Sequence, residues 1–149
     1  MLKKRRVSSI LILSVVLLFQ ACGNSGVAGV DFPLKIDDID FTVTDLETMY
    51  EWKVGSQVTK PRSSDDIILV VTAKISAGHQ EMQEKGWEYE IIDENGRTDV
   101  PGVTSFSTTT RDGKEEYSIE LVFGVNKNAE SFKLVVQDNE IVLDSLMKN

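Results

Sequence analysis

Residues 103–125 read VTSFSTTTRDGKEEYSIELVFGV, and this stretch decides the fold class. Apolar and polar residues alternate through its second half, so that Ile119, Leu121 and Phe123 share one face of an extended chain. Asp112-Gly113 lies between the two halves, and Asp-Gly is typical of a two-residue turn between antiparallel strands. The stretch predicts a β-hairpin whose Thr-rich first strand is amphipathic or lies at a sheet edge.

The same strand signals continue on both sides of this hairpin. Further strands are expected around residues 39–43, 67–71, 87–91, 132–136 and 141–143, with turns at Asn95-Gly96 and Asp138-Asn139. The run at 67–71 is apolar on both faces, which indicates a central strand covered on both sides. The sequence therefore predicts an all-β, immunoglobulin-like antiparallel β-sandwich of about seven to nine strands over residues 31–149, with a small barrel as the alternative.

Two longer polar connections interrupt the strands. They run from Gly55 to Asp66 and from Gly78 to Gly86, and the second has room for a turn or two of helix. Binding residues are concentrated on loops of this kind, so a binding surface is expected there.

Four segments together resemble the immunoglobulin-like domain of uncharacterised function that is common in bacterial secreted lipoproteins. They are IDDIDFTVTDLE (36–47), IILVVTAKI (67–75), EYEIIDENGRTD (88–99) and EYSIELVFGVNKNAESFKLVV (116–136). The positions that fit the family pattern are Phe41, Val43 and Glu47, then Ile91, Asp93 and Gly96, then Phe123, Val125 and Lys127. Asn126 stands where the family usually has proline, and Ser76-Ala77-Gly78 stands where it usually has asparagine. The resemblance implies the fold and a lipid anchor, and it brings no catalytic residue.

The first 21 residues are typical of an export signal. Met1 to Arg6 is basic, and Val7 to Phe19 is an apolar run broken only by serines. As a helix this run would reach roughly 20 Å, which is too short to cross a bilayer core of about 30 Å.

The signal ends in Phe19-Gln20-Ala21-Cys22-Gly23, which resembles the bacterial lipobox. That resemblance implies cleavage before Cys22 and a diacylglycerol on its thiol. Two acyl chains are enough for stable membrane anchoring. Residues 22–30 then form the lipidated cysteine and a small, polar tether. The alternative is an ordinary secretory signal cut at Ala21, which would leave a free thiol.

Charge and cysteine content narrow the function. With the four basic residues of the leader removed, 12 of the 16 basic residues remain against 24 acidic ones, a net formal charge of −12. This balance excludes a nucleic-acid binder driven by phosphate contacts. Cys22 is the single cysteine, so no disulfide within the chain and no thiol catalyst elsewhere are expected.

No residue pattern predicts catalysis, a metal centre or a cofactor. His79 is the single histidine, and no Gly-x-Ser-x-Gly motif accompanies it. His79 and Met82 are three residues apart and could share a helical face toward copper, but two ligands are too few for a specific site. Acidic clusters at residues 37–40, 65–66 and 93–99 fit turn chemistry and solvated charge better than a calcium loop.

We therefore expect a membrane-anchored extracytoplasmic lipoprotein that acts as a non-catalytic binding module. Its membrane contact would be the lipid on Cys22, and its partner would be a protein or another cell-envelope component. Trp52, His79 and Met82 are the candidate partner-binding residues; Trp52 either anchors a partner as an exposed ring or caps the sandwich core. The alternative function is an extracytoplasmic metal or small-ligand carrier.

Overall fold

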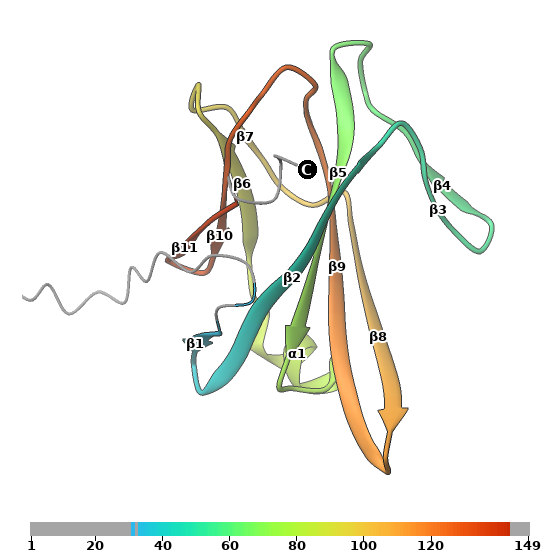
Figure 1. Cartoon of the computed structure of the whole chain (residues 1–149), viewed down its shortest axis with the longest axis vertical. Helices are drawn as coiled ribbons and strands as arrows, with labels where there is room; N and C mark the ends of the chain where they lie inside the picture. Colours follow the sequence, from blue (N-terminus) through green and yellow to red (C-terminus); the bar gives the residue numbers. More distant parts are fainter. Residues whose placement is uncertain (1–30, 32, 144–149) are drawn as a thin grey trace, which may run out of the picture.

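The computed structural model describes Asp31 and residues 33–143, and two antiparallel sheets facing each other account for most of them (Figure 1). The expected leader, Cys22 and the tether lie outside the described residues. The chain is an antiparallel β-sandwich, as the alternating sequence predicts. The elements are β1 (Leu34–Ile36), β2 (Ile39–Met49), β3 (Trp52–Val54), β4 (Gln57–Thr59), β5 (Asp66–Ile75), α1 (His79–Lys85), β6 (Tyr89–Asp93), β7 (Thr98–Asp99), β8 (Val103–Arg111), β9 (Lys114–Asn126), β10 (Phe132–Val136) and β11 (Asn139–Val142).

The seven strands expected from alternation are all present. The four additional strands, β1, β3, β4 and β7, contain only two or three residues each. Segments this short give no readable periodicity, because a period of two needs at least four residues to repeat.

The larger sheet has the order β1-β2-β5-β9-β8. Its central strand β5 is apolar on both faces, as expected. Leu69 and Val71 face the other sheet and are fully buried, whereas Ile68 and Val70 are buried on the opposite face. A strand covered on both sides needs such a continuous apolar run.

The β3–β4 hairpin covers this second face of the larger sheet. Trp52 is 5% exposed and packs with Ile68, Val70 and Val122 in a cluster separate from the main core. Figure 1 shows the hairpin on the side of the larger sheet that points away from β6, β7, β10 and β11. The connection from Gly55 to Asp66, predicted as a polar loop, is therefore partly a strand.

The smaller sheet has the order β11-β10-β6-β7, and the main core lies between it and the larger sheet. The fully buried side chains that fill this core come from both sheets. They include Phe41, Leu69, Ile91, Ile119, Leu121, Phe123, Phe132, Leu134 and Ile141.

Turn chemistry differs from the prediction at two of three sites. Asp112 and Gly113 both have positive φ between Arg111 and Lys114, so the predicted two-residue turn is confirmed. After β6 only Gly96 has positive φ, at 79°, so the turn is not the two-residue type expected from Asn95-Gly96.

The buried carboxylate of Asp93 explains the first of these differences. It accepts hydrogen bonds from the backbone N–H groups of Asn95 and Arg97, both at 2.9 Å, and this fixes a wider loop. The last turn lies one residue earlier than predicted, at Gln137-Asp138, because Val136 pairs with Asn139.

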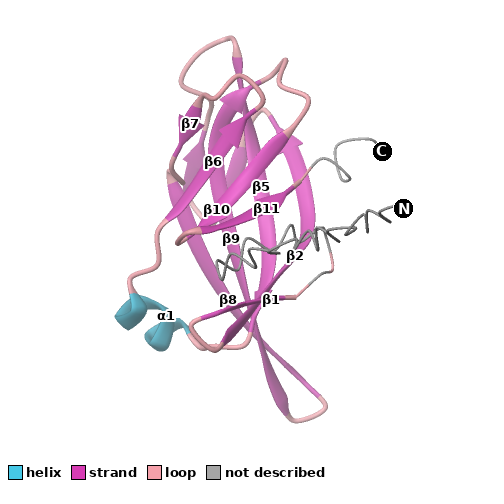
Figure 2. Cartoon of the chain, turned by 90° about the vertical axis from the view of Figure 1, so that its left-hand side faces the viewer, coloured by secondary structure: helices cyan, strands magenta, loops and turns pink. Residues whose placement is uncertain are grey.

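The connection from Gly78 to Gly86 contains the short helix expected there. Helix α1 ends where Gly86 takes the left-handed conformation and donates its N–H to the carbonyl of Met82. Figure 2 shows α1 at the end of the sandwich from which the β8–β9 hairpin projects. No helix in the described part of the chain is long and apolar enough to cross a membrane.

Candidate functional site

A groove opens along one edge of the sandwich, where the smaller sheet lacks a full edge strand. β7 pairs with β6 only at Ile91↔Asp99 and Ile92↔Thr98. Extending this register by two residues places Pro101 opposite Tyr89, and proline has no N–H to donate to a ladder. The chain then crosses to the larger sheet and begins β8. The first residues of β6 therefore have no strand beside them on this side.

The resulting groove has a volume of about 680 Å³. Small-molecule and peptide sites have volumes of this order. Helix α1, the start of β6, the β7–β8 crossing, the first half of β8 and β10 all contribute to it. The lining residues are Met82, Gln83, Gly86, Trp87, Glu88, Tyr89, Glu90, Val100, Pro101, Thr104, Phe106, Val135 and Gln137.

The floor of the groove is continuous with the main core. Met82 and Trp87 are 3% and 8% exposed and belong to the core cluster. The Trp87 ring lies against Phe41 with centroids 6.3 Å apart and planes tilted by 52°. Its indole Nε1 is buried and finds no hydrogen-bond acceptor among the described residues. Buried indole N–H groups usually have a partner, so this position is a polar site without an internal acceptor.

Two half-buried aromatic residues, Tyr89 and Phe106, form the walls beside this floor. Burial raises the pKa of the Tyr89 phenol to about 12, so this side chain is neutral at physiological pH. Phe106 stacks on the exposed imidazole of His79 with centroids 4.5 Å apart and an angle of 20°. This stack joins α1 to β8 at the end of the groove.

The charged residues that line the groove are all acidic. Glu88 is exposed and Glu90 is half-buried, and no lysine or arginine is among the lining residues. Gln83 and Gln137 add amide groups. The groove therefore has aromatic surface on its inner side and negative charge along the open edge of β6.

The three residues that the sequence analysis proposed for partner binding do not form one site in the structure. Trp52, the first residue of β3, is buried between the β3–β4 hairpin and the larger sheet, so of the two alternatives the exposed anchoring ring is wrong. The ring covers the outer face of the larger sheet, because Ile68 and Val70 leave an apolar surface there. His79 and Met82 both lie on α1 at the groove, but His79 is exposed and Met82 is buried in the core. They do not present a joint ligand pair to solvent.

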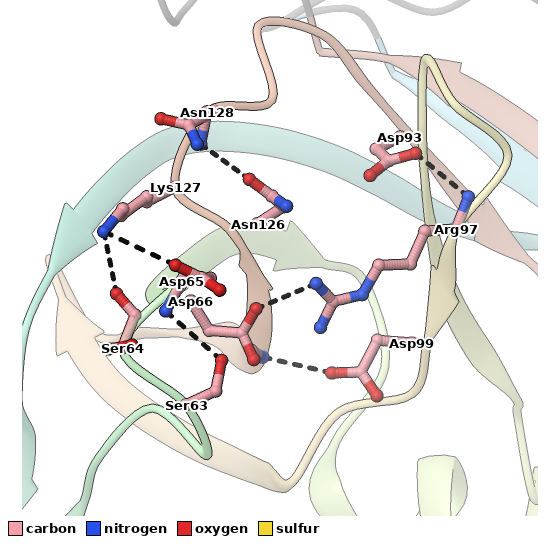
Figure 3. A network of polar contacts seen from close by, with 11 residues as sticks. Ser63, Ser64, Asp65, Asp66, Asp93, Arg97, Asp99, Asn126, Lys127 and Asn128 are labelled. Carbon is pink, nitrogen blue, oxygen red and sulfur yellow. Dashed lines mark hydrogen bonds and ion pairs between the residues drawn. The ribbon is translucent and has the colours of Figure 1, made fainter.

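A polar network joins the two sheets next to the groove (Figure 3). The Nη1 of Arg97, in the turn between β6 and β7 of the smaller sheet, donates to Oδ1 of Asp66 in the larger sheet at 2.8 Å. The backbone N–H of Gly124 in β9 donates to Oδ2 of Asp99 in β7 at 3.1 Å. The hydrogen bond from Arg97 holds the pKa of the buried Asp66 carboxyl below its usual range.

This network brings together two of the acidic clusters seen in the sequence, at residues 65–66 and 93–99. The guanidinium of Arg97 lies between them, so an internal cation already compensates their charge. In the described part of the chain, no three His, Cys, Asp or Glu side chains are arranged to hold a metal ion.

Glu94 fixes the neighbouring turn to the loop after β9. Its carboxylate accepts the backbone N–H groups of Glu130 at 3.0 Å and of Ser131 at 3.2 Å. The hydrogen bond from Glu130 contributes most to the lowered pKa of Glu94. This acidic residue therefore has a structural use.

Sequence reasoning missed Trp87, Tyr89 and Phe106 as site residues. Each occupies an ordinary apolar position in an alternating strand, so periodicity assigns it to the core. The available signal was Pro101, which follows a strand of two residues and prevents β7 from pairing along the whole of β6.

Comparison with known proteins supports the fold alone. The crystal structure of an uncharacterised β-sandwich protein from Clostridium difficile 630 is similar to this chain, with a TM-score of 0.50 and 10% sequence identity. The similarity covers 78% of this chain and 92% of that one. No protein-family model and no curated protein matches the chain.

Proposed function

We propose that this protein is an extracytoplasmic lipoprotein, anchored by Cys22, whose β-sandwich is a non-catalytic binding module with the groove as its binding surface. The strand motifs that resemble immunoglobulin-like domains of bacterial secreted lipoproteins support the same assignment.

The anchor half of the proposal rests on the lipobox-like segment around Cys22. Eight residues lie between Cys22 and Asp31, where the described part begins. An extended segment of that length spans up to roughly 30 Å. The net negative charge of the residues that follow Cys22 favours a domain held off an anionic lipid surface.

Replacing Cys22 with serine tests the anchor. The wild-type protein is expected in the membrane fraction after a high-salt wash, and Cys22→Ser in the soluble fraction. Retention of Cys22→Ser in the washed membranes would contradict lipid anchoring.

The second part of the proposal, that the sandwich binds a partner, rests on the groove. It exposes Val100 to 61% and joins aromatic walls to acidic side chains, which suits a ligand with both apolar and positively charged parts. Exposed apolar surface in a concave, partly acidic setting is more typical of a binding site than of an ordinary solvated surface.

Photocrosslinking in living cells tests this surface directly. A photoreactive phenylalanine analogue would replace Val100 or Gln83, both of which line the groove and are exposed. The matched control position is Lys74, which is exposed on the outer face of β5. We expect the same crosslinked partner from both groove positions and none from the control. Equal capture at Lys74 would show that the groove is not the binding surface.

A small-ligand carrier is the second candidate, because the volume of the groove is sufficient for a small organic molecule. A ligand that binds only the native state raises the melting temperature by mass action. Melting of the lipidated protein with small organic cations, or with copper, zinc or calcium ions, should then show a rise of several degrees. Thr104→Trp, which fills the groove, should remove the rise.

A further inference from the structure

β8 is an unusually long and unprotected edge strand. The other strands at the edges of the two sheets, β1, β7 and β11, contain three, two and four residues, whereas β8 contains nine. Natural edge strands are usually shortened, bulged, charged or interrupted by proline, which prevents pairing with other chains. β8 is in continuous register with β9 and has no proline and no charged residue before Arg111.

The register shows which backbone groups of β8 are free. Arg111 and Lys114 close a two-residue turn, so they form a hydrogen-bonded pair, and every second residue back along β8 also bonds to β9. The N–H and C=O groups of the remaining residues point away from β9, toward the free edge. These residues are Thr104, Phe106, Thr108 and Thr110.

The free edge and the groove are adjacent. Thr104 and Phe106 line the groove, and Thr104 pairs with the buried Leu121, so their side chains are on the face that looks toward the smaller sheet. A strand added to β8 would continue the larger sheet by about 4.8 Å. Every second side chain of that strand would then enter the groove.

The lining of the groove selects the side chains that fit there. Tyr89 and Phe106 present aromatic surface on the inner side of the groove. Glu90 pairs with Val135 and alternates with the inward-facing Tyr89 and Ile91, so its carboxylate is on the outer face of the smaller sheet at the open edge of β6, and Glu88 precedes the same strand. A long basic side chain that passes the open edge of β6 can satisfy both, because its aliphatic stem packs on the aromatic rings and its charged head reaches the carboxylates beyond them.

We propose that β8 and the groove bind an extended segment of another polypeptide, which adds to β8 as a strand and places alternating Arg or Lys side chains against Glu88 and Glu90. This inference rests on the proposed function and names the class of partner. Backbone hydrogen bonds supply affinity in such strand addition, and the pockets for alternate side chains supply specificity. A second copy of this chain fits less well, because both copies carry a large net negative charge.

The test uses the lipidated protein in detergent and a labelled peptide of seven residues in which arginine alternates with threonine. We expect saturable binding by fluorescence anisotropy. Three control peptides should bind at least tenfold more weakly. The first has glutamate in place of arginine, the second has its arginines in one block, and the third has N-methyl groups on alternate backbone amides.

Protein variants test the two halves of the interaction. Thr108→Pro removes a free N–H from the edge without removing a bond to β9, and it should weaken peptide binding at least tenfold. Thr109→Val, at a residue whose backbone groups bond to β9 and do not face the free edge, is the control and should bind as the wild type does. Glu88→Gln with Glu90→Gln should weaken binding at least tenfold and reduce its dependence on salt.

Several results would overturn the inference. They are equal binding of the N-methylated peptide, equal binding to Thr108→Pro, or a dimer in sedimentation that Thr108→Pro dissociates. If the arginine peptide fails to bind but Val100 still crosslinks to a partner in cells, strand addition is wrong and the groove remains a binding surface. If neither experiment gives a complex, the proposed function is wrong as well.

Discussion

One edge of the sandwich has a closed part and an open part next to each other. Around β7, polar contacts join the sheets, from Arg97 to Asp66 and from Gly124 to Asp99. Two residues further along the chain, the ladder has ended and the groove begins. The difference shows how little is needed to convert a closed edge into an open one.

Asp99 illustrates the closed part. β8 begins at Val103, opposite Val122, so it does not reach the N–H of Gly124 in the next strand. The carboxylate of Asp99 accepts that N–H instead. In the open part, the extended register would place Pro101 opposite Tyr89, and Pro101 has no N–H to donate to β6.

The largest loss of stability should come from changing Trp87, because this residue belongs to both the groove and the core. Trp87→Ala removes a ring that is 8% exposed and should lower the free energy of unfolding by about 3–5 kcal/mol. Urea denaturation measures this, with the half-buried Phe106→Ala as a milder control. A loss below about 1 kcal/mol would mean that the groove floor is independent of the core.

Removing the polar contact that closes the edge around β7 should destabilise the protein less than the change at Trp87. Arg97→Met leaves the Asp66 carboxylate, 8% exposed, without its cation, and should destabilise the protein by about 2 kcal/mol. Lys127→Met is the matched control, since its ion pair with Asp65 is exposed, and should cost below about 0.5 kcal/mol. Equal effects in urea denaturation would show that the Asp66–Arg97 pair does not hold the sheets together.

The Asp66–Arg97 ion pair also predicts that the stability of the protein depends on pH in the acidic range. The pKa of Asp66 is lower in the folded protein than its ordinary value of 3.8, so below that value the unfolded chain takes up a proton before the folded one does. The stability it contributes is therefore present above about pH 4 and is lost as the pH falls through the folded pKa. Melting temperatures between pH 6 and pH 2.5 should decline more steeply for the wild type than for Asp66→Asn. Parallel curves would contradict this assignment.

The smallest effect on stability should come from the acidic side chains of the open part. Glu88→Gln and Glu90→Gln break no hydrogen bond or ion pair made by either side chain among the described residues, and each should change the free energy of unfolding by less than about 0.5 kcal/mol. Thermal melting measures this. A clear loss of stability would show that these carboxylates support the fold rather than await a partner.

Sequence alternation predicted the long strands because the polarity of each side chain indicates whether that position is buried or exposed. The run at 67–71 is an example, since its lack of polar residues anticipated a strand covered on both faces. Alternation could not identify what covers the second face, because the contact between Trp52 and Ile68 depends on how the β3–β4 hairpin folds back. The groove was not predicted for the same reason, since it depends on which strand fails to reach Tyr89. The turn after Asn95-Gly96 was predicted in place but not in type, because the Asp93 carboxylate determines its backbone.

The separation of Trp52 from Trp87 gives the protein two optical probes at different places. They are the two tryptophans of the chain, one in β3 against the outer face of the larger sheet and the other at the floor of the groove. In Trp52→Phe, the remaining indole emission comes from the groove alone. Binding of a ligand to that variant can then be followed as a change in the wavelength or intensity of the Trp87 fluorescence, without a label on either molecule.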